Sequence, residues 1–123
     1  MCGIYSAFSY DASHTLDEQA HIKSFDTIKH RGPDSSTLTL IDDQVCFGFH
    51  RLAINGLTPD SDQPISIVGI HLICNGEIFN YKQLIEEHKL LVQTKSDCEV
   101  IVHLYLKYGI RKAITMLDGE FAF

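Results

Sequence analysis

The chain has 123 residues, of which 45% are hydrophobic, and its formal net charge is −6. No apolar run is long enough to span a bilayer, and the scattered lysines and arginines form no basic stripe, so neither a membrane-spanning helix nor a nucleic-acid-binding surface is indicated. The segment after Met1 lacks the basic and apolar stretches of a signal peptide, so we expect a cytoplasmic protein.

The first segments predict a strand followed by a helix. Residues 4–10 are rich in aromatic and apolar side chains and predict a buried strand. Thr15 and Glu18 have the spacing of a capping box, which predicts the start of a helix. The turn Arg31-Gly32-Pro33-Asp34 contains glycine and proline and predicts the end of this helical segment.

Two hairpins are predicted next. Residues 37–41 and 45–52 alternate apolar and polar side chains around an Asp-Asp turn, which is typical of two paired strands. Residues 55–64 predict a loop. Residues 65–68 and 70–74 flank Gly69 and predict a second hairpin that ends before Asn-Gly.

Two helices and a final strand complete the pattern. A short helix is expected at residues 81–88 with Asn80 as its cap, and a longer one from the capping box of Ser96 and Glu99 to Gly109. Residues 116–123 predict a turn that enters an apolar strand, and a strand requires partners and a covered face. We therefore expect a fragment of an α+β domain with no marker of a second domain.

The start of the chain offers a nucleophile. If Met1 is removed, Cys2 carries a free α-amine, which titrates at about pH 8, and a thiol, which titrates at about pH 8.5. The amine can then take the thiol proton directly or through a water molecule. The alternative is that Cys2 is a small second residue present by chance.

The cysteines predict neither a disulfide nor a metal site. All of them are far apart and no C-x-x-C pair is present, which favours free thiols in a reducing compartment. A metal-binding module is therefore the least favoured interpretation. The cysteines are Cys2, Cys46, Cys74 and Cys98.

Several blocks, together spanning essentially the whole chain, resemble one family. They are MCGI (residues 1–4), HRGPD (30–34), GFHRLAI (48–54), NGEIFN (75–80), SDCEV (96–100) and LDGEFAF (117–123). The chain resembles the class II glutamine amidotransferases of the N-terminal nucleophile hydrolase superfamily and, within it, the asparagine synthetases. The resemblance implies a four-layer α-β-β-α sandwich, incomplete at the C-terminus, with residues 1–123 forming the N-terminal part of the amidotransferase domain.

The resemblance also implies a catalytic role for three residues. Cys2 would attack the side-chain amide of glutamine, ammonia would leave, and water would hydrolyse the resulting thioester. Asn75 and Gly76 would donate hydrogen bonds to the oxyanion. The alternative is that Asn-Gly is an ordinary turn.

Three charged residues are implied to bind the α-groups of glutamine. Arg51 would pair with the α-carboxylate, and Glu77 and Asp97 would accept from the α-ammonium. The alternatives are a surface arginine, a solvated turn carboxylate and a favourable charge at the start of a helix. We expect the Arg31–Asp34 turn and the neighbouring His30 and His50 to have structural roles.

In the family, a second domain uses ATP and Mg²⁺ to activate aspartate, and ammonia from glutamine serves asparagine synthesis. No phosphate-binding loop is present in this sequence, so we expect no cofactor in this chain, and the synthetase domain is absent. The expected partners are glutamine and either a homo-oligomer or a synthetase domain. The alternative function is a non-catalytic, truncated remnant that binds a partner.

Overall fold

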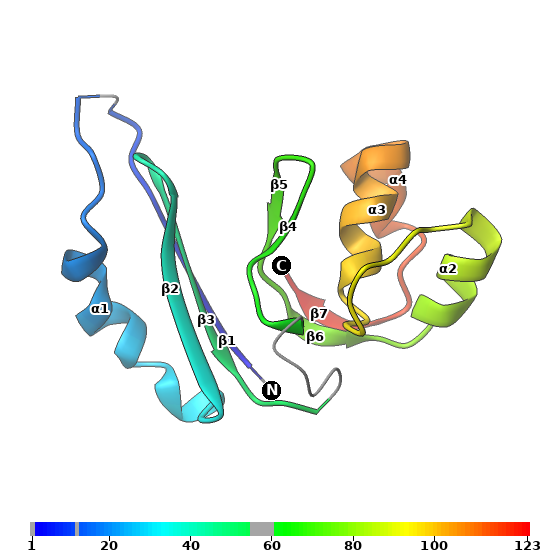
Figure 1. Ribbon diagram of the computed structural model, residues 1–123, viewed down its shortest axis with the longest axis horizontal. Coiled ribbons are helices and arrows are strands. Elements are labelled where there is room, and N and C mark those ends of the chain that lie inside the picture. The colour runs from blue at the N-terminus through cyan, green and yellow to red at the C-terminus, as the bar shows by residue number, and fades with distance from the viewer. Residues whose placement is uncertain (1, 12, 55–60) are drawn as a thin grey trace. The chain divides into compact units, whose positions relative to one another are not determined.

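The computed structural model describes residues 2–11, 13–54 and 61–123 (Figure 1). The chain divides into two compact units, residues 1–53 and 54–123. Both contain helices and antiparallel strands, as expected for an α+β protein. The predicted removal of Met1, the strand break at residue 12 and residues 55–60 of the predicted loop lie outside the described residues.

The first unit is an antiparallel sheet with one helix. Its strands are β1 (Gly3–Phe8), β2 (Ser35–Asp42) and β3 (Val45–Arg51), in the order β1-β3-β2. The first predicted strand and the first predicted hairpin are therefore confirmed. Helix α1 (Glu18–Asp26) lies beside the sheet, and the 3₁₀ helix η1 (Lys29–Arg31) follows it (Figure 1).

Helix α1 is anchored to the sheet by Phe25, the buried residue of the helix. A side chain at Gly48 would come within 2.6 Å of the Phe25 ring, so glycine on β3 leaves the space that the ring fills. The predicted cap was wrong, because the N-cap is Asp17, whose carboxylate accepts from Gln19 N at 3.0 Å. A direct helix-capping contact thus prevails over the Thr15 spacing.

The second unit contains two short antiparallel pairs and three helices. Strands β4 (Ile65–Ile67) and β5 (Ile70–Leu72) form the second predicted hairpin, and Val68 and Gly69 form its turn with φ of 49° and 75°. Positive φ at both turn residues is typical of a two-residue hairpin. The helices are α2 (Tyr81–His88), α3 (Glu99–Tyr108) and α4 (Ile110–Ile114).

The other pair joins distant parts of the sequence. Strand β6 (Asn75–Ile78) pairs with β7 (Gly119–Ala122), so the predicted final strand is confirmed. The prediction that Asn75-Gly76 simply ends a hairpin was wrong, because these residues begin β6. Pairing with a strand far along the chain selects the extended conformation over the turn that Asn-Gly favours locally.

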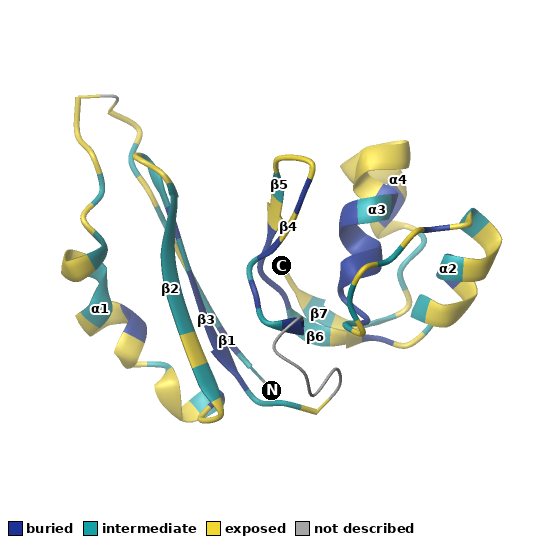
Figure 2. Cartoon of the chain, viewed as in Figure 1, coloured by how far each residue is buried: buried dark blue, intermediate teal, exposed yellow. Residues whose placement is uncertain are grey.

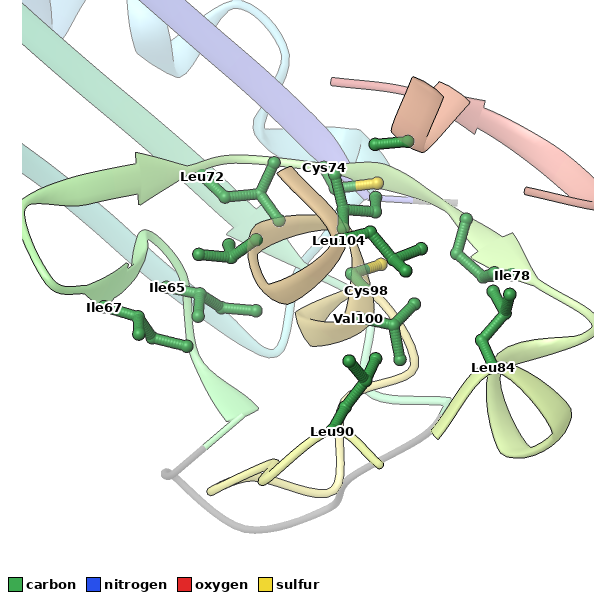
Figure 3. Close-up of a cluster of buried hydrophobic side chains, with 13 residues drawn as sticks. Ile65, Ile67, Leu72, Cys74, Ile78, Leu84, Leu90, Cys98, Val100 and Leu104 are labelled. Atoms are coloured by element: carbon green, nitrogen blue, oxygen red, sulfur yellow. The ribbon is translucent and has the colours of Figure 1, made fainter. Parts of the chain in front are cut away.

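The core of the second unit lies between the hairpin, β6 and α3. Figure 3 shows side chains from these elements and α2 gathered in one apolar cluster that includes Cys74, Cys98 and Leu104. The first turns of α3 are buried, whereas its last residues and most of α4 are exposed (Figure 2). Among the described residues, no helix is both long and apolar enough to cross a membrane.

Two predicted caps in this unit were wrong. The Asn80 side chain does not cap α2, because it donates to the Met116 carbonyl at 2.9 Å and accepts from Asp118 N at 3.0 Å, tying down the segment that enters β7. The predicted capping box of α3 is also not formed, because Ser96 Oγ accepts instead from Cys98 N, the N-cap residue. The predicted end of α3 at Gly109 is confirmed.

Glu99 serves the loop before α3 rather than a capping box. Its fully buried carboxylate accepts from Gln93 N, Thr94 N and Thr94 Oγ1, each at 2.6 Å, and lies 3.0 Å from His103 Nε2. Burial alone would raise the pKa of the Glu99 carboxyl, but the hydrogen bonds from Thr94, Gln93 and His103 outweigh it, so the pKa is lowered.

We expect the second unit to lose stability in acid through Glu99. Because the folded pKa of Glu99 is lowered, its contribution is complete above the ordinary glutamate value of about 4.3 and is lost as the pH falls through the folded pKa. Glu99→Gln should cost about 2–3 kcal/mol at pH 7 and flatten this acid dependence, because hydrogen bonds to a charged group are lost. Urea unfolding between pH 3 and pH 7 checks both expectations. Equal acid dependence in both proteins would contradict the assignment.

Candidate active site

Cys2 lies at the end of the first unit's sheet. Its Sγ accepts from Leu52 N at 3.4 Å and donates to the Leu52 carbonyl at 3.6 Å. Its own carbonyl accepts from Arg31 Nε at 2.9 Å. Contacts on both the side chain and the backbone therefore orient Cys2, and the link to the Arg31 side chain was not expected from the sequence, which assigned that residue only to a turn.

Among the four cysteines, all of which lie in described segments, Cys2 is the partly exposed one and the other three are buried. Cys74 and Cys98 are 1% and 3% exposed. A hydrogen bond with Cys74, burial and the charge of Asp97 raise the pKa of the Cys98 thiol, so it stays protonated at neutral pH. The expectation that Cys74 and Cys98 are buried as small apolar residues is confirmed. Cys2 is thus the thiol best placed to meet a substrate.

The conserved spacing of the turn before β2 has a structural explanation within this chain. Asp34 Oδ2 accepts from Ala53 N at 2.8 Å, and Asp34 N donates to the Arg51 carbonyl at 3.0 Å. A Cβ at Gly32 would lie 2.1 Å from the His50 carbonyl oxygen, so only glycine permits this approach. The turn therefore clamps the end of β3, which carries Arg51.

Arg51 is the last residue of β3 and only 7% exposed. Gly3 pairs with His50 across β1 and β3, so Cys2 and Arg51 follow at the same end of the sheet. A buried guanidinium near a thiol at a sheet end can recognise a carboxylate with two parallel hydrogen bonds. The first unit thus brings together the predicted nucleophile and the predicted carboxylate-binding residue.

His50 is held structurally, as expected. Its ring stacks on Phe25 with centroids 3.7 Å apart, Nε2 lies 3.0 Å from the Phe25 carbonyl, and Nδ1 lies 2.7 Å from Ser36 Oγ. A carbonyl can only accept, so Nε2 carries a proton. Both ring nitrogens are engaged in these contacts, which leaves His50 no access to a substrate. His30 lies exposed in η1.

In the second unit, the backbone of β6 determines where the Gly76 N–H points. Phe79 N donates to the Asp118 carbonyl at 2.7 Å, so the Phe79 N–H faces the β7 side. In an extended strand, the N–H groups of alternate residues point to the same edge. Gly76 is three residues before Phe79, so its N–H faces the edge of β6 away from β7. A Cβ on Gly76 would lie 2.5 Å from Phe121 Cα, which explains the glycine.

Asp97 lies on this same edge of β6. Its Oδ2 accepts from Ile78 N at 2.7 Å, and the residue is 6% exposed. The structure thus joins Asp97 to the strand that carries Asn75, Gly76 and the exposed Glu77. This contact differs from the alternative role of a free charge at the start of a helix.

The Asn75 side chain has unused hydrogen-bonding capacity. Its Oδ1 is buried and finds no hydrogen-bond partner among the described residues. An unsatisfied buried polar atom costs about 1–3 kcal/mol and calls for an explanation such as a ligand or a water molecule. This observation favours a binding role over a simple turn.

The predicted site residues are therefore divided between the two units. Cys2 and Arg51 belong to the first, and Asn75, Gly76, Glu77 and Asp97 belong to the second. Among the described residues, no group of three or more histidine, cysteine, aspartate or glutamate side chains is arranged to hold a metal ion.

Comparison with known proteins identifies the family. A family model described as "Glutamine amidotransferase domain" matches residues 1–123. The chain is 40% identical over 129 residues to asparagine synthetase [glutamine-hydrolyzing] of Homo sapiens, and 41% identical to those of Gallus gallus over 128 residues and Mus musculus over 129 residues. All of this chain is covered, but it spans 22% of the length of these relatives. The chain belongs to the glutamine amidotransferase domain family, whose enzymes use glutamine.

Proposed function

We propose that this chain is the glutaminase portion of a glutamine-hydrolysing asparagine synthetase. The observation that carries the proposal is Cys2, the partly exposed thiol, oriented by Leu52 at the sheet end where Arg51 also lies. The names of the relatives, which specify glutamine hydrolysis by asparagine synthetases, support the same reaction. The ammonia released would serve asparagine synthesis in a longer protein.

The proposed reaction has two steps. The Cys2 thiolate attacks the side-chain carbonyl carbon of glutamine, and the carbon–nitrogen bond breaks as the nitrogen takes a proton from the α-ammonium of Cys2 and leaves as ammonia. Water then attacks the glutamyl thioester, the carbon–sulfur bond breaks, and glutamate and the free thiol result. The sum is glutamine and water to glutamate and ammonia, with no oxidant or cofactor.

The other site residues stabilise charge in this scheme. Asn75 and Gly76 donate to the oxyanion that forms in each step. Arg51 binds the α-carboxylate of glutamine, while Glu77 and the second carboxylate oxygen of Asp97 accept from its α-ammonium. The N–H of Gly76 on the edge of β6 away from β7 supports the first assignment, and the burial of Arg51 supports the second.

The wider architecture is part of the proposal. Residues 1–123 would form the first part of a four-layer α-β-β-α sandwich, and ATP and Mg²⁺ would act only in a separate synthetase domain. The antiparallel sheets with helices in both units support this fold. A homo-oligomer or a synthetase domain remains the proposed protein partner, and the cytoplasm the proposed location.

Intact mass spectrometry tests the function directly. The purified chain is weighed before and after treatment with a diazo-ketone analogue of glutamine, which alkylates an activated cysteine. We expect a starting mass that lacks Met1 and a single adduct on Cys2, with glutamine protecting against labelling. A Cys2→Ser chain is the matched control and should take no adduct. Loss of Met1 without an adduct would instead support the non-catalytic remnant.

A further inference from the structure

Gln63 makes an unusual pair of contacts just before β6. Its Oε1 accepts from Cys74 N at 2.5 Å, and its Nε2 donates to the Cys74 carbonyl at 3.1 Å. Gln63 is buried, as is Cys74. One side-chain amide thus bonds both backbone groups of one residue, as a residue of a neighbouring antiparallel strand does in a hydrogen-bonded pair.

The position of this contact links it to the donors of the candidate site. Cys74 immediately precedes Asn75, and its N–H lies on the same edge of β6 as that of Gly76, by the alternation derived from Phe79. On the other side of Gly76, Ile78 N donates to Asp97. The Gly76 N–H is therefore flanked along one edge by two side-chain contacts, one from Gln63 and one from Asp97.

The chemistry of the contact argues for more than filling the core. An apolar side chain of similar size would occupy the same volume without fixing the Cys74 peptide groups, whereas the glutamine amide restrains a donor and an acceptor together. Because oxyanion donors act only at short, well-aligned distances, an error of about 1 Å in a catalytic group can cost about 100-fold in rate. A residue that fixes the backbone one position before Asn75 therefore affects both donors.

We propose that Gln63 is a positioning residue that orients Asn75 and Gly76 for glutamine hydrolysis. The proposal rests on the glutaminase function proposed above. Gln63 does not touch the substrate. It acts through Cys74, in the way that a missing neighbouring strand would, and no motif marked it in the sequence because a glutamine before a proline in a loop has no periodic or spacing signal.

The decisive variant is Gln63→Glu. When the new carboxyl group is protonated, it has one donor and one acceptor, as the glutamine amide has, and both bonds to Cys74 can form. When it is ionised, one oxygen faces the Cys74 carbonyl and repels it. We therefore expect the kcat of Gln63→Glu, divided by that of the parent chain, to be near unity at about pH 5 and to fall about 10- to 100-fold by about pH 8. The KM for glutamine should change much less.

Two further variants separate positioning from folding. Gln63→Met removes both bonds and should lower kcat at every pH, while Gln19→Glu, an exposed change of the same chemistry, should leave the kcat ratio independent of pH. If Gln63→Met fails to fold, the reversible pH response of Gln63→Glu still decides the question, with circular dichroism reporting the folded fraction. A kcat ratio that does not vary with pH, or an effect confined to KM, overturns the proposal.

Amide NMR distinguishes failure of this inference from failure of the proposed function. In Gln63→Glu, the amide signals of both Cys74 and Gly76 should shift with the same midpoint as the kcat ratio. Movement at Cys74 without movement at Gly76 would show an anchor that does not position the donor, and would overturn the proposal. If the parent chain neither hydrolyses glutamine nor takes the Cys2 adduct, the proposed function and the catalytic part of this inference both fail, while these signals still decide whether Gln63 orients the backbone.

Discussion

Cys2→Ala is expected to abolish glutamine hydrolysis, lowering kcat by at least about 10⁴-fold, because removal of a nucleophile eliminates the covalent route altogether. The fold should be retained, since Cys2 is partly exposed and Arg31 bonds its backbone carbonyl, which alanine preserves. Glutamate release from glutamine, followed together with the circular dichroism spectrum, measures both expectations.

Cys46→Ala is the matched control for this experiment. Cys46 is fully buried, and burial together with the nearby charge of Glu18 raises the pKa of its thiol. Its loss should lower stability by removing core packing while kcat is kept. Equal losses of kcat in Cys2→Ala and Cys46→Ala would contradict a nucleophilic role for Cys2.

A third chain tests the α-amine separately from the thiol. Adding one residue that is not removed before Cys2 leaves the sulfur in place but converts the amine to an amide, which cannot accept a proton. The proposed mechanism predicts loss of hydrolysis comparable to that of Cys2→Ala. Full activity in the extended chain would require a different base.

Asn75→Ala is expected to lower kcat by about 10²- to 10³-fold, the usual effect of removing one oxyanion donor. The donor acts mainly when negative charge develops on the carbonyl oxygen, so the KM for glutamine should change much less than kcat. Steady-state kinetics of glutamate release separate the two parameters. The unpartnered, buried amide oxygen of Asn75 also predicts little loss of stability, because the variant removes an unsatisfied group.

Asn80→Ala provides the opposite pattern as a control. The Asn80 amide bonds the Met116 carbonyl and Asp118 N, so its removal should destabilise the second unit while the kcat of the folded protein is kept. The two asparagines lie at the beginning and just after the end of β6. If Asn75→Ala mainly lowers stability and leaves kcat intact, its amide has a structural role and the oxyanion assignment is wrong.

Local chemistry explains why many elements were predictable. The alternation of β2 and β3, the Gly69 turn of the second hairpin, the bounds of α2 and the end of α3 at Gly109 all follow from interactions within a few residues. Helix α4 was not predicted, because its five residues follow Gly109 directly and carry too short a pattern to reveal a period.

The failed predictions share a physical reason. Asn80 and Glu99 occupy sequence positions typical of caps, but their side chains bond the segment before β7 and the loop at Gln93 and Thr94 instead. These partners provide buried or better aligned hydrogen bonds than a helix end exposed to water. Tertiary contacts therefore prevail over local capping preferences when a polar side chain is buried.

The sequence by itself determined the family, the candidate nucleophile Cys2 and the residue types suited to glutamine, because these depend on short motifs in a constant order. Only the tertiary structure decided that Asn75 begins a strand, that the Gly76 N–H points away from β7, and that Gln63 and Asp97 bond the backbone on either side of it. Those features arise from pairing between β6 and a strand far along the chain and from side chains that substitute for a missing neighbouring strand. Neither leaves a periodic pattern in the residues concerned, so the orientation of the donors is a property of the fold.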